Sequence, residues 1–193
     1  MGAKEQSGTD GEAIAASLED PARFKLVFDR HATAVYRYIY RRIGSDAVEE
    51  LTSDTFVTAF DFRERFKGQD ALPWLYGIAA NVLRRYRRTE IRRQRAYARA
   101  GSLLAIDSED DRIEDRLDAA AAAPELARAL EQLEPGDRDV LLLLAWEELS
   151  YQEIAESLDI PIGTVASRLS TARRVIRESL GDGWSSESEA HDG

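Results

Sequence analysis

The side chains of this sequence best suited to chemistry are arginines, and the chemistry they offer is phosphate binding. Eight of them fall between Arg84 and Arg99 with Glu90 as the one acid, and Tyr86 and Tyr97 are interleaved. Guanidinium groups bind phosphates through a fork of N–H donors, and aromatic rings stack on exposed bases. A solvated surface is the simpler interpretation of a charge run, but it does not explain so one-sided a charge. The stretch therefore favours binding to nucleic acid.

The sequence offers little from which a catalytic or metal site could be built. It contains two histidines, no cysteine and no glycine-rich phosphate loop, so thiol catalysis, disulfides and cysteine-ligated zinc are excluded. His31 lies on the apolar face of a predicted helix with no second candidate ligand nearby, which is typical of a core histidine with satisfied hydrogen bonds. We therefore predict no enzyme activity, no catalytic residue, no metal, no cofactor and no small-molecule substrate.

A second candidate for nucleic-acid binding spans residues 150–174. Ser150 and Glu153 have the spacing of a capping box, which predicts the start of a helix, and Pro161 suits the first turn of the next helix. Apolar residues at helical spacing predict the buried stripe of that second helix: Val165, Leu169, Ala172 and Ile176. Polar residues fall off the stripe: Thr164, Ser167, Arg168 and Thr171. We interpret the segment as a helix-turn-helix that reads duplex DNA, although an ordinary helical hairpin with a solvated face has the same pattern.

Helical periodicity in nearly every patterned stretch predicts an all-α protein. A long helix is predicted over about residues 23–42, ended by Gly44. A glycine interrupts the pattern within residues 66–70 and predicts a loop, after which a helix should run from about residue 71 past Tyr97. The first half of this last helix is apolar and aromatic, whereas its second half carries the arginines.

The charge distribution predicts two compact segments bounded by acidic stretches. The chain has a net charge of −10, but residues 23–100 carry +8 and residues 101–123 carry −5. We expect two small helical domains, at residues 22–100 and 124–180, joined by an acidic flexible linker at 101–123. The remaining residues are expected to form a flexible N-terminal extension (1–21) and a disordered acidic tail (181–193). The overall acidity does not exclude DNA binding, but it should weaken binding by the isolated chain.

Nothing in the sequence predicts a membrane or export function. No apolar run approaches the ~20 residues that span a bilayer, and the polar N-terminus lacks the apolar core of a signal peptide. We therefore expect a soluble, cytoplasmic protein without membrane insertion.

The order of several motifs resembles one known family. Residues 73–88 (Pro-Trp-Leu-Tyr-Gly-Ile-Ala-Ala-Asn-Val-Leu-Arg-Arg-Tyr-Arg-Arg) resemble the promoter-melting region of extracytoplasmic-function (group IV) sigma factors of the sigma-70 family. Residues 46–56 resemble the helix by which these proteins bind core RNA polymerase. Leu133-Glu134-Pro135, the leucine run after it and residues 149–169 resemble region 4 of the same family. Each motif is moderately specific, and the ordered set, which spans about residues 22–180, is highly specific.

The resemblance implies a dissociable specificity subunit that binds core RNA polymerase and directs it to specific promoters. It implies a polymerase-binding acidic face on the helix at 46–56, composed of Asp46, Glu49, Glu50, Leu51 and Asp54. It implies that region 2 melts the −10 element and captures a flipped base in the loop of Phe66, Lys67, Gly68, Gln69 and Asp70. It implies that Asn81 contacts this element, and that Arg84, Arg85, Tyr86 and Arg88 hold the strand backbone or flank the melted bases. It implies that region 4 reads the −35 element with Thr164, Ser167, Arg168, Thr171 and Arg173. An anti-sigma factor is a further partner that members of this family commonly have.

Two departures from the pattern of the family leave the strength of −35 binding open. Ala166 stands where the family frequently has a basic residue, and Ser170 and Thr171 replace a bulkier or basic pair, which suggests weaker −35 binding or more reliance on DNA shape.

A sigma mimic that titrates an anti-sigma factor is one alternative function, although the intact basic helix counts against it. A helix-turn-helix repressor that binds its operator without polymerase is another. The regulon, the promoter bases and the inducing signal do not follow from the sequence.

Overall fold

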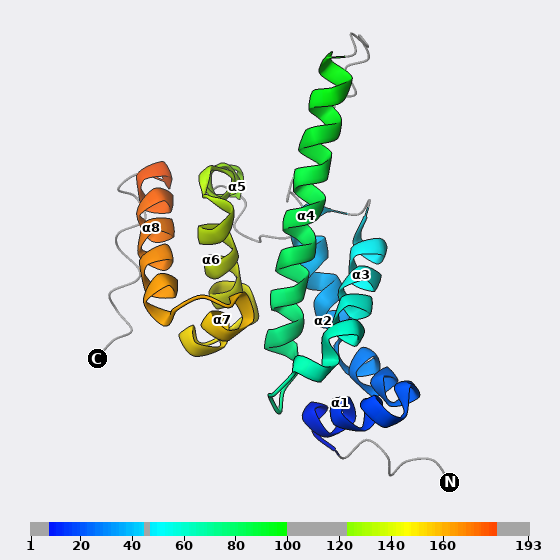
Figure 1. Cartoon of the computed structure of the whole chain (residues 1–193). Coiled ribbons are helices and arrows are strands. Elements are labelled where there is room, and N and C mark those ends of the chain that lie inside the picture. The colour runs from blue at the N-terminus through cyan, green and yellow to red at the C-terminus, as the bar shows by residue number, and fades with distance from the viewer. Residues whose placement is uncertain (1–7, 45–46, 100–122, 181–193) are drawn as a thin grey trace, which may run out of the picture. The chain divides into compact units, whose positions relative to one another are not determined.

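The computed structural model describes residues 8–44, 47–99 and 123–180, and all regular structure within them is helical, as predicted (Figure 1). Two compact units are formed. The first contains α1 (Asp10–Glu19), α2 (Lys25–Ile43), α3 (Val48–Phe62) and α4 (Leu72–Arg99), with short 3-10 turns at Pro21–Phe24 and Arg63–Arg65. The second contains α5 (Ala123–Gln132), α6 (Pro135–Glu147), α8 (Ile162–Leu180) and the start of α7 (Tyr151–Leu158). The predicted linker, up to residue 122, and the predicted tail lie outside the described residues.

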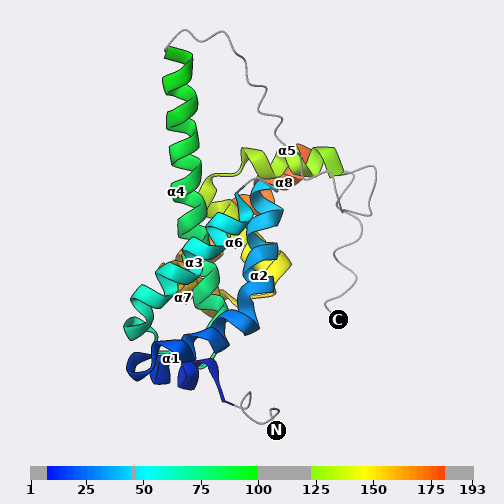
Figure 2. The ribbon, with the colours of Figure 1, turned by 90° about the vertical axis from the view of Figure 1, so that its right-hand side faces the viewer.

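The first unit is a bundle of α2, α3 and α4 with α1 across one end (Figures 1 and 2). Its core consists of fully buried side chains from all three long helices: Val27, Val35, Ile39, Val48, Ala59, Leu75 and Ala79. The rings of Tyr38 and Tyr76 pack together with their centroids 4.9 Å apart. Gly44, at φ 71°, ends α2 as predicted, because a glycine tolerates this left-handed conformation. The bundle therefore holds the first half of α4 rigidly.

The expectation of a flexible extension over residues 1–21 is wrong for residues 10–19, which form α1. Thr9 and Glu12 make a capping box, in which each side chain accepts a hydrogen bond from the backbone N–H of the other. Ile14 is only 2% exposed and Ser17 is buried, so one side of the helix belongs to the core. A helix of ten residues is marginal by itself, and tertiary packing stabilises it here.

The second unit buries a cluster contributed by α5, the turn after it, α6 and α8: Leu130, Leu133, Leu142 and Ala172. The two helices expected from the sequence are present as α7 and α8, and Asp159 forms the turn between them at φ 51°. The predicted stripe of α8 is confirmed, because Val165 and Leu169 are buried like Ala172, and Ile176 packs against the cluster. The outer side of α8 is thereby turned to solvent.

The capping box at the start of α7 is also confirmed. The backbone N–H and the hydroxyl of Ser150 donate to the Glu153 carboxylate over 2.8 and 2.6 Å, and the Glu153 N–H donates to the Ser150 hydroxyl. The bond from the Ser150 hydroxyl, followed by the bond from its N–H, lowers the pKa of Glu153 below its ordinary value of 4.5. The carboxylate form is therefore the one that this structure favours.

Glu153→Ala should destabilise the second unit at pH 7 by about 0.5–1 kcal/mol, the usual effect of losing a cap. Because the pKa is lowered on folding, the wild-type advantage is present above pH 4.5 and is lost as the pH falls through the lower value of the folded state. Urea unfolding of both proteins as a function of pH checks this. Glu131→Ala, at an exposed position of α5, is the control. A wild-type advantage that grows on acidification would contradict the assignment.

Among the described helices, none has both the length and the apolar character needed to cross a membrane.

Candidate nucleic-acid interface

The polar face of α4 is formed by residues at helical spacing: Asn81, Arg84, Arg85 and Arg88. Steps of three and four residues bring side chains to one side of a helix. Asn81, Arg85 and Arg88 are exposed, and Arg84 is half-buried. The opposite side of α4 is anchored by buried Leu75, Ala79 and Leu83, so this face has a fixed position on the bundle. An amide and three guanidinium groups in one row suit a nucleic-acid strand, with the amide facing a base edge and the cations facing phosphates.

Not every arginine of the basic stretch belongs to this face. Arg87 turns toward α2, where its guanidinium donates to the carbonyl oxygen of Arg42 over 3.1 Å. That carbonyl lies in the last turn of α2, so Arg87 caps the helix and complements its dipole. Tyr86 is half-buried. The arginines and the tyrosine predicted beyond Arg93 are in α4, but their side chains lie outside the described part of the protein.

The predicted loop at residues 66–70 precedes α4 and has a defined conformation. The Phe66 ring packs against Trp74 with the ring centroids 5.0 Å apart. Gly68 passes over that ring so closely that a Cβ atom there would lie 3.0 Å from it. Lys67 and Gln69 are exposed, whereas one carboxylate oxygen of Asp70 accepts the Leu72 N–H over 2.9 Å and so caps α4. The loop therefore has a defined conformation in the protein without DNA.

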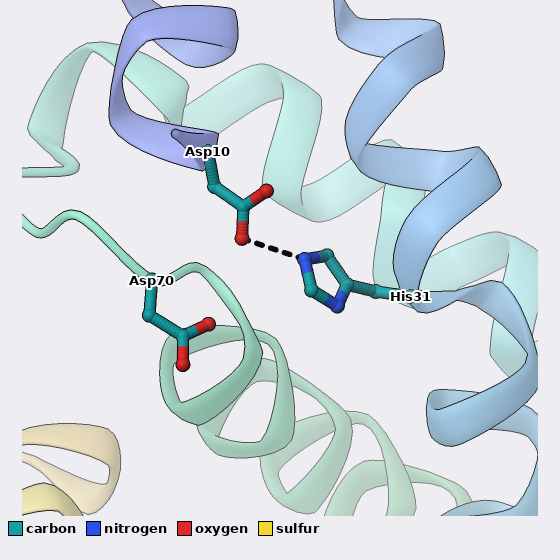
Figure 3. A group of neighbouring side chains, drawn as sticks. All are labelled: Asp10, His31 and Asp70. Atoms are coloured by element: carbon teal, nitrogen blue, oxygen red, sulfur yellow. Dashed lines mark hydrogen bonds and ion pairs between the residues drawn. The ribbon is translucent and has the colours of Figure 1, made fainter. Parts of the chain in front are cut away.

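A buried carboxylate, which the sequence analysis missed, lies beneath this loop. Asp10, at the start of α1, accepts hydrogen bonds from Arg30 over 2.8 Å and from the backbone N–H of Ala71 over 3.0 Å. His31 Nε2 lies 2.6 Å from the second carboxylate oxygen of Asp10 (Figure 3). Burial acts to raise the pKa of Asp10, but the bonds from Ala71, Arg30 and His31 outweigh it and lower the pKa below 3.8. The prediction that His31 has no candidate ligand nearby is therefore wrong.

Asp10, His31 and Asp70 offer ligand-type atoms within 4.8 Å of one another, which raises the question of a metal site. Both oxygens of Asp10 already accept hydrogen bonds, and Arg30 brings a fixed positive charge to the same carboxylate. The carboxylate of Asp70 lies over the first turn of α4, where it accepts the Leu72 N–H (Figure 3). A divalent cation would have to displace these donors and approach a cation. The donor set thus fits a charge-paired clamp better than a metal centre.

The acidic face of α3 keeps Glu49, Glu50 and Asp54, all of which are exposed. Leu51 is 4% exposed and belongs to the core, so the structure removes it from the predicted polymerase-binding set. Asp46 lies outside the described residues. Val57 was missed, although it is 60% exposed and follows Glu50 by two helical turns. An exposed valine in a row of acids is the signal that could have identified it.

The outer face of α8 carries Ser167 and Thr171, which are exposed. Their hydroxyls donate to backbone carbonyls of the same helix, at Thr164 and Ser167 respectively. Arg174 continues this row but was missed; it pairs with Glu178 over 2.9 Å. Arg173 is exposed on another sector of α8, because residues two apart do not face the same way.

Thr164 and Arg168 of the predicted −35 set are half-buried. The Arg168 guanidinium lies over Gly136 in the first turn of α6, where an added Cβ atom would come within 2.9 Å of it. The structure thus places this guanidinium against the start of α6.

Comparison with known families assigns the two units separately. The family model described as Sigma-70 region 2 matches residues 27–93, within the first unit. The model described as Sigma-70, region 4 matches residues 124–176, from α5 into α8. The two matches follow the order predicted from the motifs.

Individual relatives agree with this assignment. The chain is 30% identical over 156 residues to the ECF RNA polymerase sigma factor SigE of Mycolicibacterium smegmatis, covering 78% of this chain and 59% of that protein. It is 29% identical over 173 residues to the ECF RNA polymerase sigma-E factor of Haemophilus influenzae, covering 83% and 89%. The sigma factor RpoE of Bartonella quintana, solved in complex with the anti-sigma factor NepR, superposes with a TM-score of 0.56 at 23% identity over 81% of this chain and 96% of that one. This last likeness shows the fold alone.

Proposed function

The chain belongs to the extracytoplasmic-function sigma factors of the sigma-70 family, and on that premise we propose that it binds core RNA polymerase and directs it to specific promoters. The ordered match of regions 2 and 4 to its two units is the observation that carries the proposal. Members of this family are transcription initiation factors, and the proposed role needs no chemistry of its own. The protein would act in the cytoplasm, where polymerase and chromosome are found.

Region 2 would melt the −10 element and hold it open. Extruding a base costs a few kcal/mol, so a receiving loop that is already ordered lowers the total cost. The loop at residues 66–70 meets that need, because Phe66 and Trp74 fix its shape. Asn81 would read a base edge while Arg85 and Arg88, one and two turns further along α4, hold the strand by its phosphates.

Region 4 would place α8 in the major groove of the −35 element. Ser167 and Thr171 are its central polar contacts, and the row continues to Arg174. Arg168 would reach a base or phosphate. Thr164 then contributes at the margin of this surface, whereas Arg173 would contact DNA from another sector of α8.

The acidic face of α3 would dock on core polymerase. Glu49, Glu50 and Asp54 attract a basic partner surface and orient its approach. Val57 supplies an exposed apolar group in the same row, of the kind that adds affinity when an interface buries it. Because a relative of the same fold is held by an anti-sigma factor, such a regulator is also the natural partner to seek for this chain.

Run-off transcription with purified core polymerase tests the proposed function. Pooled genomic fragments from the source organism serve as templates, and the transcripts are sequenced. We expect discrete transcripts whose start sites share two spaced elements upstream, and which disappear when the protein is omitted. The absence of any such transcript would refute the proposal.

The same preparation separates the two alternatives. A repressor would bind one duplex fragment tightly without polymerase, whereas we expect little specific binding by the free chain because it carries a net charge of −10. A sigma mimic would bind an anti-sigma factor and give no transcript from any template.

A further inference from the structure

We infer that α1 positions the loop at residues 66–70, which is proposed to capture a base of the −10 element. Asp10 and Gly11 would do so by binding the backbone of the loop and of Ala71, which follows it. The inference rests on the proposed −10 role of that loop. It concerns a part of the chain that precedes both family matches, which begin at residue 27.

Asp10 joins three segments that are far apart in the sequence. Its carboxylate takes hydrogen bonds from Arg30 and lies against His31, both on α2, and it also accepts the N–H of Ala71. Ala71 is fully buried and directly precedes α4. The first N–H groups of a helix have no partner within the helix. Here the loop's own Asp70 satisfies the N–H of Leu72, and α1 satisfies the N–H of Ala71.

Gly11 makes the second tie, directly to the loop backbone. Its N–H donates to the carbonyl oxygen of Gln69 over 3.2 Å. A Cβ atom at position 11 would lie 2.6 Å from the carbonyl oxygen of Gly68. That atom belongs to the backbone and cannot move without shifting the loop. The close approach of α1 to the loop therefore requires a glycine at this position.

The loop has two anchors of its own, the Phe66–Trp74 ring contact and the Asp70 cap, and the ties to α1 add to them. Lys67, Gly68, Gln69 and Asp70 are all exposed, and Phe66 is only half-buried. The carbonyl oxygen of Gln69 and the N–H of Ala71 are both hydrogen-bonded to residues of α1. A loop that is ordered before binding loses less conformational entropy when it receives a base. Loosening α1 should therefore weaken −10 capture while the docking face of α3 stays intact.

Gly11→Ala in the full-length protein tests the inference within the holoenzyme. We expect open-complex formation, measured by permanganate footprinting on the promoter with the strongest run-off transcript, to fall by about tenfold to a hundredfold, as misplacing a binding group does. Core-polymerase affinity should stay at the wild-type value. Ala15→Ser changes an exposed small residue of the same helix and should have no effect on either quantity.

The outcomes separate this inference from the function it rests on. If wild-type holoenzyme forms no open complexes, the proposed function fails. If wild type and Gly11→Ala form them equally well, the inference alone is overturned. A general folding defect would lower core affinity and open complexes together, and that result would also count against a positioning role.

Amide hydrogen exchange of the wild-type protein gives a test that needs no variant. The inference requires the N–H groups of Gly11 and Ala71 to exchange at similarly slow rates, because α1 and the loop open together. Asp10→Asn should accelerate exchange at Ala71 and Gly11 but not at Ala79, which is fully buried further along α4. Fast exchange at Ala71 in the wild-type protein would overturn the inference.

Discussion

A protein carrying Glu50→Lys and Asp54→Lys should bind core RNA polymerase at least about a hundredfold more weakly than wild type, since each reversal is expected to cost about 1.4 kcal/mol or more. Both side chains are exposed and lie one turn apart on α3. The reversal turns attraction to a basic partner surface into repulsion, and neither residue contributes to the core. The loss should shrink at high salt, because exposed charges are screened. Fluorescence anisotropy of labelled protein titrated with core polymerase measures both effects.

Glu19→Lys with Glu64→Lys is the matched control for this experiment. It changes the net charge of the same unit by the same amount, at two exposed positions outside α3. The control should bind core polymerase like wild type. Equal losses in both proteins would show that overall charge, and not the α3 face, governs binding.

Asn81→Ala should lower transcription from a promoter of this protein by about tenfold to a hundredfold, which corresponds to the 1–3 kcal/mol of a good base contact. Asn81 is exposed at the start of the polar row of α4, so its removal leaves no cavity. Core affinity should be unchanged, because the proposed docking face lies on α3 and not on α4. Run-off transcription and a polymerase-binding titration on the same samples separate the two quantities.

Thr33→Ala, which removes an exposed polar side chain from α2, serves as the control for Asn81→Ala. It should leave transcription at the wild-type level. If Asn81→Ala reduced core affinity as much as transcription, the assignment of Asn81 to the −10 element would be wrong.

The sequence predicts the helical fold well because its signals are local. Gly44, the capping box at Ser150 and the apolar stripe of α8 each specify a helix boundary or a buried side without help from distant residues. The helix α1 was not predicted, because contacts with distant residues hold it in place. Its capping box at Thr9 was readable, but its position depends on Asp10 meeting α2 and Ala71, which are distant in the chain.

The candidate site was harder to predict than the fold, since residue type does not reveal burial. Leu51 was grouped with acidic neighbours but belongs to the core, and Val57 was passed over although it is exposed. Arg87 carries the same charge as Arg88 but caps α2. Only tertiary structure separates an arginine that holds the protein together from one that is free to meet a phosphate.

The hydroxyl groups on α8 have a consequence for the proposed reading of the −35 element. Ser167 and Thr171 donate their protons to carbonyl oxygens of their own helix, so the lone pairs of both oxygens point outward. These two hydroxyl groups can therefore accept hydrogen bonds from a partner but not donate them. In the major groove the donors are the amino groups of adenine and cytosine, whereas guanine and thymine present acceptors there. If α8 reads the −35 element as proposed, Ser167 and Thr171 would therefore favour adenine or cytosine at the positions they face, as long as their two internal hydrogen bonds persist.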